Sequence, residues 1–352
     1  DRWCPRSPHA EVAGFRIPDG VALLGQANVR THRLRLATER GRGIRGLTYL
    51  ASLLAFAWRN RARFDVVYCR GLADAALALS FAKWIRLVRW PVLAVPINAK
   101  GRGDASFLRS VPGWPLWRHL LDSQIDAINL INGEIAGELD EIGLRLPERS
   151  SIPNGIEVLP AIVRTGVRRP RRLVWTGRFE HQKGLDVLME ALVGIGQLAD
   201  RCTVELYGEG PLRQPLAAQA EAMGLAGVVR FGGLLDKDGI RDMLATADAF
   251  LLPSRYEGMS NSALEAMEAG LPVLCTSCGG IDLAVKEGAG WVCMAGDSTS
   301  LEEALKAMLS ATDEEWLARG RKARAIVEQR FRIEHVASRN LDRLKALAEA
   351  VS

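Results

Sequence analysis

Short apolar segments alternate with segments of helical periodicity from residue 173 to residue 293. We expect strands at 173–176, 203–207, 228–231, 249–253, 272–276 and 290–293. Between them, spacing of the apolar residues predicts helices at 184–196, 211–223, 237–246, 260–269 and 281–286. Such alternation is typical of βαβ units, which build a parallel, doubly wound sheet. The fold class of this region is therefore α/β and Rossmann-like.

The first half is less regular but is of the same class. Strands are expected at 65–69, 91–96 and 126–131, with helices at 73–88 and 134–142. These segments predict a second Rossmann-like domain. Residues 1–30 contain no convincing first strand and no glycine-rich turn, with both of which such a domain normally opens. We therefore expect the first domain to be incomplete and the chain to lack its natural N-terminus.

Chain length favours two domains. A chain of 352 residues with 48% hydrophobic content is too long for one comfortable core. The turn signal Pro153-Asn154-Gly155 marks the boundary, and the charged segment 164–172 is interpreted as a linker. We predict a first domain at 1–160, a second domain at 161–332, and a C-terminal helix at 333–352 that packs back on the first domain. Further helices are expected at 298–309 and 313–331.

Charge is unevenly distributed. Residues 1–160 carry 22 Lys and Arg against 15 Asp and Glu, whereas residues 161–352 carry 24 against 26. A basic first half suggests an anionic partner such as lipid headgroups or a phosphorylated acceptor, and an arginine-rich surface without a partner is an equal alternative. The apolar segments 46–58 and 75–90 are too short or too interrupted to span a bilayer. Both are interpreted as core helices with a basic edge, which leaves peripheral membrane association open; no nucleic-acid partner is expected.

Six cysteines are scattered through the chain, and no signal peptide is visible at its start. A reducing, cytoplasmic location fits this usage best, with the inner face of the plasma membrane as the peripheral alternative. Cys275 and Cys278 have C-x-x-C spacing, but no second pair completes a metal site. A structural role for these thiols is favoured over redox or zinc chemistry.

Unusual residues follow the predicted strands, where ligands of parallel sheets bind. Gly177 and Arg178 follow the strand 173–176, and Lys183 precedes the next helix. Two fixed cations near a helix N-terminus suit a diphosphate, and two solvated side chains beside a turn are the alternative. Gly208 and Gly210 begin like a dinucleotide fingerprint.

Position 213 is arginine, and no ribose-binding acid follows at the usual distance, so a nicotinamide site is disfavoured. The glycines at 208 and 210 nevertheless indicate that another group passes close to the backbone. Phe231 with Gly232 and Gly233 ends the third strand, either to clear space for a base or as a tight turn.

Two glutamates eight positions apart form the strongest constellation. Glu257 lies in the loop after the strand 249–253, and Glu265 lies on the following helix. Between them, Gly258, Met259, Ser260 and Asn261 form the helix entry, with Ser260 or Asn261 as the N-cap. Free amide groups there can hold phosphate, while the two carboxylates grip hydroxyl groups on either side of it. A carboxylate at 265 is expensive to bury without a partner, which argues against a purely structural residue.

Taken together, these motifs resemble glycosyltransferase family 4. The matching elements are Gly177-Arg178 with Lys183-Gly184, Gly208-Glu209-Gly210, Phe231-Gly232, the pair Glu257 and Glu265, and Gly279-Gly280. The resemblance covers most of residues 65–335. It implies a bacterial-type GT-B enzyme, with two Rossmann-like domains facing across a cleft. Such an enzyme retains anomeric configuration while it transfers sugar from a nucleotide-sugar donor, UDP- or GDP-linked, to a polysaccharide, glycolipid or other cell-envelope acceptor.

The resemblance also implies roles for individual residues. Arg178 and Lys183 would neutralise the donor diphosphate, Glu257 would contact the transferred sugar, and Glu265 would bind the ribose. No metal or other cofactor is expected, because arginine and lysine do the electrostatic work. In the first domain, the loop that often carries a histidine reads 97–104 without one, so Lys100 and Asp104 become acceptor-side candidates.

Two alternatives share this fold. A nonhydrolysing nucleotide-sugar epimerase would change the donor's stereochemistry without an acceptor. A non-catalytic protein would keep the fold and bind nucleotide without transfer. The missing histidine and the unusual start keep both open.

Overall fold

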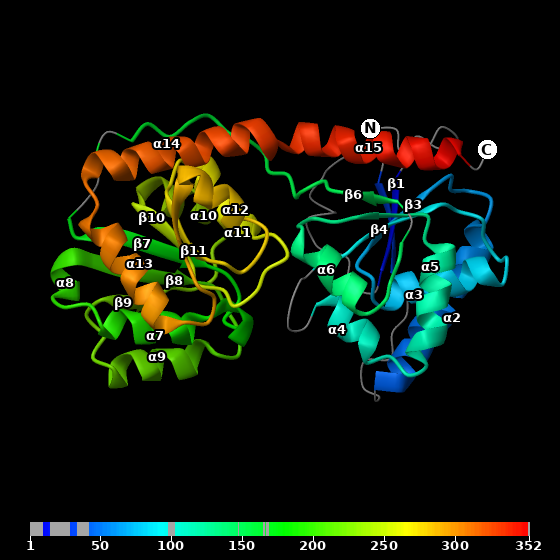
Figure 1. Cartoon of the computed structure of the whole chain (residues 1–352), viewed down its shortest axis with the longest axis horizontal. Coiled ribbons are helices and arrows are strands. Elements are labelled where there is room, and N and C mark those ends of the chain that lie inside the picture. The colour runs from blue at the N-terminus through cyan, green and yellow to red at the C-terminus, as the bar shows by residue number, and fades with distance from the viewer. Residues whose placement is uncertain are drawn as a thin grey trace. The chain divides into compact units, whose positions relative to one another are not determined.

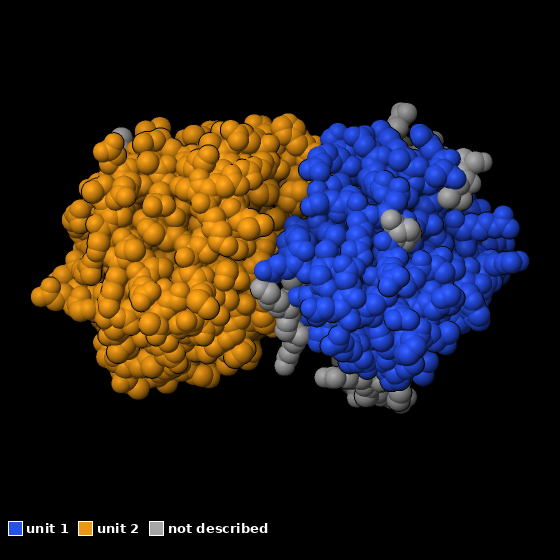
Figure 2. Space-filling view, in the orientation of Figure 1, with its two compact units in different colours: residues 1–152, 337–352 blue, residues 153–336 orange. Residues whose placement is uncertain are grey.

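The computed structural model describes residues 10–14, 29–33, 42–97, 103–146, 148–164, 166 and 169–350. The chain forms two compact units (Figure 2). Unit 1 comprises residues 1–152 and 337–352, and unit 2 comprises residues 153–336. The division between them falls inside the turn segment 152–156.

Unit 2 contains a six-stranded parallel sheet with the order β12-β11-β10-β7-β8-β9. The strands are β7 (Arg171–Thr176), β8 (Cys202–Tyr207), β9 (Val229–Phe231), β10 (Ala249–Leu252), β11 (Val273–Thr276) and β12 (Gly290–Cys293). The helices are α7 (Leu185–Val193), α8 (Leu198–Arg201), α9 (Arg213–Ala222), α10 (Lys237–Thr246), α11 (Asn261–Glu268), α12 (Asp282–Ala284), α13 (Ser298–Ser310) and α14 (Asp313–Arg330). Every strand and helix predicted between 173 and 331 is present, with ends shifted by a few residues.

Helices cover both faces of this sheet (Figure 1). Alternate residues of β7 point to opposite sides, so Leu173 and Trp175 join one buried cluster and Val174 joins another. The first cluster lies under α7, α9 and α13, and the second under α10, α11 and α14. A sheet buried on both faces explains why its strands are nearly continuous apolar runs.

The direction of winding reverses between β7 and β10. From β7 the chain adds β8 and β9 on one side, then returns to place β10 on the other side of β7. The loops that leave β7 and β10 therefore diverge toward opposite faces, and ligands of such sheets bind in the crevice between them. Residues 177–184 and 253–260, which carry most of the predicted site, are these two loops.

Unit 1 is built on a four-stranded parallel sheet with the order β3-β4-β5-β6. Its strands are β3 (Val67–Arg70), β4 (Val92–Val95), β5 (Ala127–Asn129) and β6 (Arg149–Ser150). Its helices are α2 (Arg42–Asn60), α3 (Asp74–Trp84), α4 (Asp104–Arg109), α5 (Trp114–Gln124) and α6 (Glu134–Glu141). The predicted second α/β unit is confirmed, while α4, α5 and β6 were missing from the prediction.

Two expectations about irregular segments were wrong. Strand β1 (Ala10–Gly14) pairs in parallel with β2 (Val29–Arg33), although no strand was expected in residues 1–30. The end of the supposed linker 164–172 is also regular structure, because Arg171 and Arg172 begin β7. The buried Arg171 guanidinium lies 4.7 Å above the Trp316 ring and 2.6 Å from Asp313, so packing and pairing outweigh the cost of placing a cation in a strand.

Helix α15 (Ile333–Glu349) ends the described chain. Its residues from 337 onward belong to unit 1, where Arg343 pairs with Glu148 at 2.5 Å and Arg339 donates to the Ser151 carbonyl oxygen at 2.9 Å. Within the described residues, no helix has the length and hydropathy to cross a bilayer.

Candidate functional site

The loops that follow β7 and β10 are held together by their backbones. The Arg255 amide donates to the Gln182 carbonyl oxygen at 2.8 Å, and the Gln182 side chain donates to the Tyr256 carbonyl oxygen at 3.0 Å. Gly184 has φ +63°, and a β-carbon there would lie 2.1 Å from the Pro253 carbonyl oxygen. Only glycine fits at this contact, so Gly184 allows the two loops to pack closely against each other beside the crevice.

A lysine and a glutamate from these two loops form an ion pair. The Lys183 ammonium lies 2.6 Å from Glu257 Oε1, which also accepts a hydrogen bond from the Ser254 hydroxyl at 2.7 Å. Glu257 is buried, and Lys183 is 21% exposed. The structure thus brings together two predicted site residues that are 74 positions apart. A pair of this kind has strong positional order and presents a cation to the crevice.

Arg178 lies on the same loop in a different environment. Its side chain is 75% exposed and pairs with Glu180 at 2.6 Å. An exposed pair contributes little to stability, so the guanidinium can exchange Glu180 for another anion at small cost. Lys183 and Arg178 therefore offer one largely buried cation and one exposed cation beside the crevice.

Gly208 and Gly210 serve the packing of one loop on another. A β-carbon at Gly208 would lie 1.9 Å from the Gly177 carbonyl oxygen, and one at Gly210 would lie 2.6 Å from that of Phe179. The Phe179 amide also donates to the Glu209 carbonyl oxygen at 3.0 Å. The close approach that the glycines indicated is therefore made by the loop 177–179 of the same chain.

Phe231 also contacts this loop. Its half-buried ring packs on buried Phe179 with centroids 5.9 Å apart. At Gly232, a β-carbon would lie 2.3 Å from the Tyr207 ring, whereas Gly233 has open space around it. Of the two open interpretations of these glycines, Gly232 fits a tight contact and Gly233 fits cleared space.

The entry to α11 has the geometry that its sequence predicted. Ser260 is the N-cap, and its hydroxyl accepts a hydrogen bond from the Ala263 amide at 3.3 Å. Gly258 and Met259 are fixed by Gly280, where a β-carbon would lie 2.4 Å from the Gly258 carbonyl oxygen. The first amide groups of such a helix point out of its N-terminus and suit an anion.

Two glutamates on α11 are one turn apart but have different surroundings. Glu268 is buried, pairs with Arg324 at 2.6 Å and accepts the Leu159 amide at 2.8 Å. Glu265 is half-buried and makes no ion pair with any of the described residues. Burial raises its pKa, opposed by Lys237, and Glu268 raises it further. A desolvated carboxyl without a fixed cation is typical of a ligand-binding residue.

Glu265 lines a pocket of about 440 Å³ in unit 2. The segment 155–162 forms one wall, while α10 contributes Lys237 and Arg241 and α11 contributes Asn261. Lys237 reaches across to pair with exposed Glu157 at 3.1 Å. This pocket has the size of a small-molecule site and carries both hydroxyl-binding and anion-binding groups.

Several residues that support the site had no role in the prediction. Arg255 binds Asp186 of α7 through both carboxylate oxygens at 2.7 Å, and Asn154 donates to Asn261 at 3.0 Å and to the Met259 sulfur at 3.2 Å. An acidic residue in the first turn of α7 was the available signal for Asp186. Nothing local marks Asn154, which lies 107 positions from Asn261.

The acceptor-side candidates have separate outcomes. Lys100 lies outside the described residues. The Asp104 carboxylate accepts the Leu72 amide at 3.1 Å and the Ile97 amide at 2.7 Å, so it ties together the loops that follow β3 and β4. Its oxygens are engaged with backbone donors, which makes loop positioning its evident role.

The described residues contain no His, Cys, Asp or Glu cluster able to hold a metal ion. Asp236 and Asp238 have Asp-x-Asp spacing, yet the Asp236 side chain caps α10 by accepting the Gly239 amide at 2.8 Å. Cys275 and Cys278 are free and buried, and burial raises the pKa of the Cys278 thiol to about 12. Their C-x-x-C spacing therefore belongs to an unreactive core.

Parts of the chain are similar in sequence to known proteins. Residues 170–311, most of unit 2, match the family described as glycosyl transferases group 1. Glycogen synthase of Mycobacterium tuberculosis is 33% identical over 312 residues, which cover 86% of this chain and 70% of that protein. Phosphatidyl-myo-inositol mannosyltransferase of Mycobacterium leprae is 30% identical over 185 residues, 49% of this chain and 48% of the relative.

Solved structures extend the likeness to both units. HepE of Anabaena, in complex with UDP and glucose, has a TM-score of 0.75 at 20% identity over 96% of this chain and 92% of its own. Sucrose-phosphate synthase of Thermosynechococcus elongatus has a TM-score of 0.76 at 16% identity over 98% of this chain and 100% of its own. These likenesses show the GT-B fold, and the glycogen synthase relative shows the family. The chain belongs to the group 1 glycosyltransferases.

Proposed function

We propose that this glycosyltransferase uses a UDP-linked sugar and transfers it with retention of anomeric configuration, without a metal ion, to a saccharide or lipid-linked acceptor of the cell envelope. The observation that carries this proposal is the Lys183–Glu257 pair, made at 2.6 Å between the two loops of the crevice. The HepE structures, solved with UDP and with UDP-glucose, support a uridine nucleotide.

The chemistry of the donor suits the two cations. When the bond between the sugar and the diphosphate breaks, negative charge develops on the departing phosphate oxygen. Lys183, held by Glu257, and Arg178, released from Glu180, would stabilise that charge in place of a metal ion. The amide groups at the start of α11 would bind the other phosphate oxygens.

The two carboxylates would then hold the two sugar rings of the donor. Glu257 lies beside Lys183, so it would accept hydrogen bonds from hydroxyl groups of the transferred sugar. Glu265 lies about one turn into α11 and lines the 440 Å³ pocket, where it would bind the ribose hydroxyl groups. Retention requires the acceptor oxygen to approach from the face that the diphosphate leaves, so the cations would lie near both oxygens.

Titration calorimetry and product analysis test the proposal. The wild-type chain is titrated with UDP and with GDP, and UDP binding is expected to be the tighter. Glu265→Ala is expected to weaken UDP binding by about ten-fold or more, as for loss of hydrogen bonds to a charged group. Glu221→Ala, an exposed carboxylate on α9, is the matched control.

The transferred sugar is followed by proton NMR after incubation of UDP-glucose with a panel of saccharide and glycolipid acceptors. A product with the donor's anomeric configuration supports retention. Equal affinity of wild type and Glu265→Ala for UDP would contradict the site, and epimerised donor without transfer would identify an epimerase. Transfer that is abolished by a chelator and restored by a divalent cation would contradict metal independence.

A further inference from the structure

Two helix-to-strand turns of unit 1 are rich in arginine and exposed aromatic residues. One turn, residues 58–66, joins α2 to β3, and the other, residues 84–91, joins α3 to β4. Five of their residues are arginines, at positions 59, 61, 63, 86 and 89, and Asp65 is the acidic residue among them. We call these two turns the basic-aromatic edge.

Buried contacts make the two turns one surface. The buried Trp90 indole donates to the Arg61 carbonyl oxygen at 3.2 Å, and Phe64 contacts the Trp90 ring edge at a centroid distance of 5.3 Å. Lys83, at the end of α3, pairs with Asp126 at the start of β5. The turns are therefore held side by side, and the side chains of their five arginines are exposed.

The outward side chains combine large apolar groups with cations. Trp58 is 57% exposed, Trp84 is 59% exposed and Ile85 is 44% exposed. The Arg61 guanidinium lies 5.7 Å from the Trp58 ring. Large apolar side chains exposed to water are unfavourable, whereas tryptophan and arginine side by side suit a boundary between water and acyl chains.

Arg86 adopts a backbone conformation that favours glycine. Its φ is +56°, and it occupies the position after the C-cap of α3. The Arg86 amide bonds to the Lys83 carbonyl oxygen and the Leu87 amide to that of Ala82, both at 2.9 Å, which completes a Schellman motif. An arginine here costs stability relative to glycine, and its side chain is exposed at the surface of the turn.

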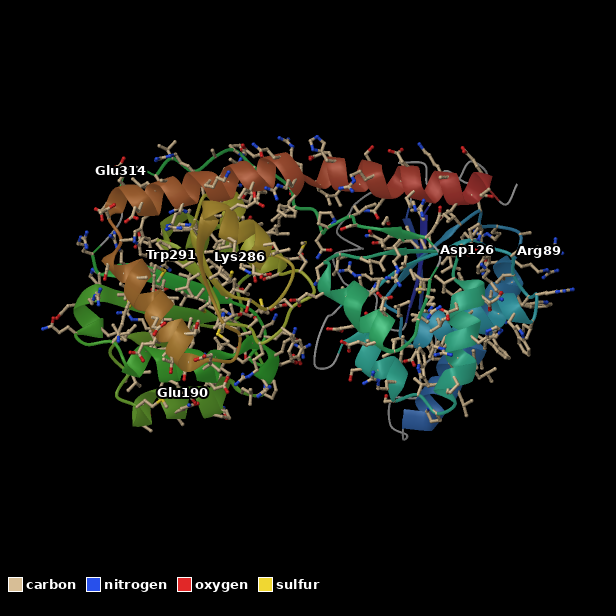
Figure 3. All side chains as sticks on the ribbon, viewed as in Figure 1. Arg89, Asp126, Glu190, Lys286, Trp291 and Glu314 are labelled. Atoms are coloured by element: carbon tan, nitrogen blue, oxygen red, sulfur yellow. The ribbon has the colours of Figure 1, made fainter. Side chains whose placement is uncertain are left out.

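The basic-aromatic edge lies away from the ligand edge of its own sheet. Helix-to-strand turns lie at the amino ends of parallel strands, whereas the loops tied by Asp104 follow the carboxyl ends of β3 and β4. Figure 3 shows Arg89 extending into solvent from this end of unit 1, with Asp126 inward of it. An occupant of this edge therefore leaves the carboxyl ends of the sheet accessible.

We propose that the basic-aromatic edge docks on an anionic lipid bilayer. The arginines would bind the negative headgroups, at about 1 kcal/mol or roughly five-fold in affinity for each one. Trp58, Trp84 and Ile85 would enter the headgroup boundary. An extended anionic polymer offers no apolar phase for these three side chains, which is why a bilayer fits better.

Vesicle flotation with the full chain tests this docking. Wild type is mixed with vesicles of phosphatidylcholine alone or with 30% phosphatidylglycerol, and only the anionic vesicles are expected to carry it. The double variant Arg61→Glu/Arg89→Glu is expected to lower the partition coefficient by at least about thirty-fold. Arg109→Glu, an exposed arginine at the end of α4, is the matched control and should bind as wild type does.

Arg86→Gly separates docking from folding. Because glycine relieves the backbone strain, this variant is expected to melt roughly one to three degrees higher while binding anionic vesicles about five-fold more weakly. Trp58→Ser/Trp84→Ser should weaken vesicle binding at unchanged net charge. UDP affinity, measured by calorimetry, should stay the same in all these variants, which keeps the outcome separate from that of the proposed function.

Three results would overturn the proposal. They are absence of wild-type binding to anionic vesicles, equal binding of wild type and the double charge reversal, and retention on an anionic polysaccharide resin without vesicle binding. The last would assign the edge to a soluble polyanion.

Discussion

The loops at the carboxyl ends of the two sheets are held together in different ways. In unit 2, the loops after β7, β8 and β10 contact each other through glycine backbones at 177, 184 and 208. In unit 1, the described parts of the loops after β3 and β4 are joined through a side chain, the carboxylate of Asp104. Because backbones hold the loops of unit 2, Arg178 and Lys183 are not needed to hold them and can serve a ligand. In unit 1, by contrast, the Asp104 carboxylate accepts hydrogen bonds from the loops that it joins.

The largest expected loss of stability comes from a substitution that disrupts the backbone packing of unit 2. Gly208→Ala places a β-carbon 1.9 Å from the Gly177 carbonyl oxygen at φ +137°, so unfolding free energy should fall by about 4 kcal/mol or more. Chemical denaturation followed by tryptophan fluorescence measures it. Gly233→Ala is the control, since no atom lies within 4 Å of its β-carbon. Equal stability of the two variants would mean that the loops are not held by this contact.

The second prediction concerns the cation that this packing leaves available. Lys183→Met removes the partner of buried Glu257, and it should lower kcat by about a hundred- to a thousand-fold. It should also cost about 3 kcal/mol of stability, because the buried Glu257 carboxylate loses the cation that compensates its charge. UDP release from UDP-glucose and thermal unfolding measure the two effects.

The double variant Lys183→Met/Glu257→Gln separates them. Without either charge, stability should return close to that of wild type while transfer stays low. Recovery of transfer together with stability would show that the pair acts only on folding.

The third prediction applies the same logic to unit 1. Asp104→Ala leaves the Leu72 and Ile97 amides without their carboxylate, so stability should fall by about 2 kcal/mol. Asp104→Asn keeps one acceptor oxygen and should lose less. Because Asp104 positions loops, KM for the acceptor should rise in the folded variants while kcat changes little. A large loss of kcat in folded Asp104→Asn would instead place this carboxyl at the reacting atoms.

The two units also differ in how much of their structure could be predicted from the sequence. In unit 2 the strands are apolar on both faces, so the βαβ alternation and the glutamate pair were visible as local patterns. The residue that each side chain contacts could not be predicted from these patterns. Lys183 and Glu257 are 74 positions apart, and only the reversal of winding between β7 and β10 brings them together.

For the glycines, too, the sequence did not show which group they contact. The motif at 208–210 indicated close contact, but a ligand and a neighbouring loop impose the same demand on a glycine. The segment 164–172 was misjudged because charge normally indicates solvent, and the Trp316 ring that covers Arg171 is 145 positions away. In unit 1, β1 and α4 lack strong periodicity, so no pattern predicted them.

The smallest expected effect compares the two glutamates of α11. Burial raises the pKa of Glu265 above 4.5, so the folded protein binds a proton more readily than the unfolded chain. The free energy of unfolding is therefore unaffected by this group below pH 4.5, and it falls as pH rises from there through the raised pKa. Glu265→Gln cannot titrate and should be slightly more stable than wild type at pH 7, with the difference vanishing below pH 4.5.

Glu268→Gln is the matched control, since it breaks the pair with Arg324 and should destabilise the protein at pH 7. Thermal unfolding of both variants from pH 4 to pH 8 measures how each substitution changes stability. A gain in stability together with weaker UDP binding in Glu265→Gln is what a site residue shows, because binding groups are kept at a cost to folding. Destabilisation of Glu265→Gln at neutral pH would mean that Glu265, like Glu268, holds the structure together and that the ribose has another partner.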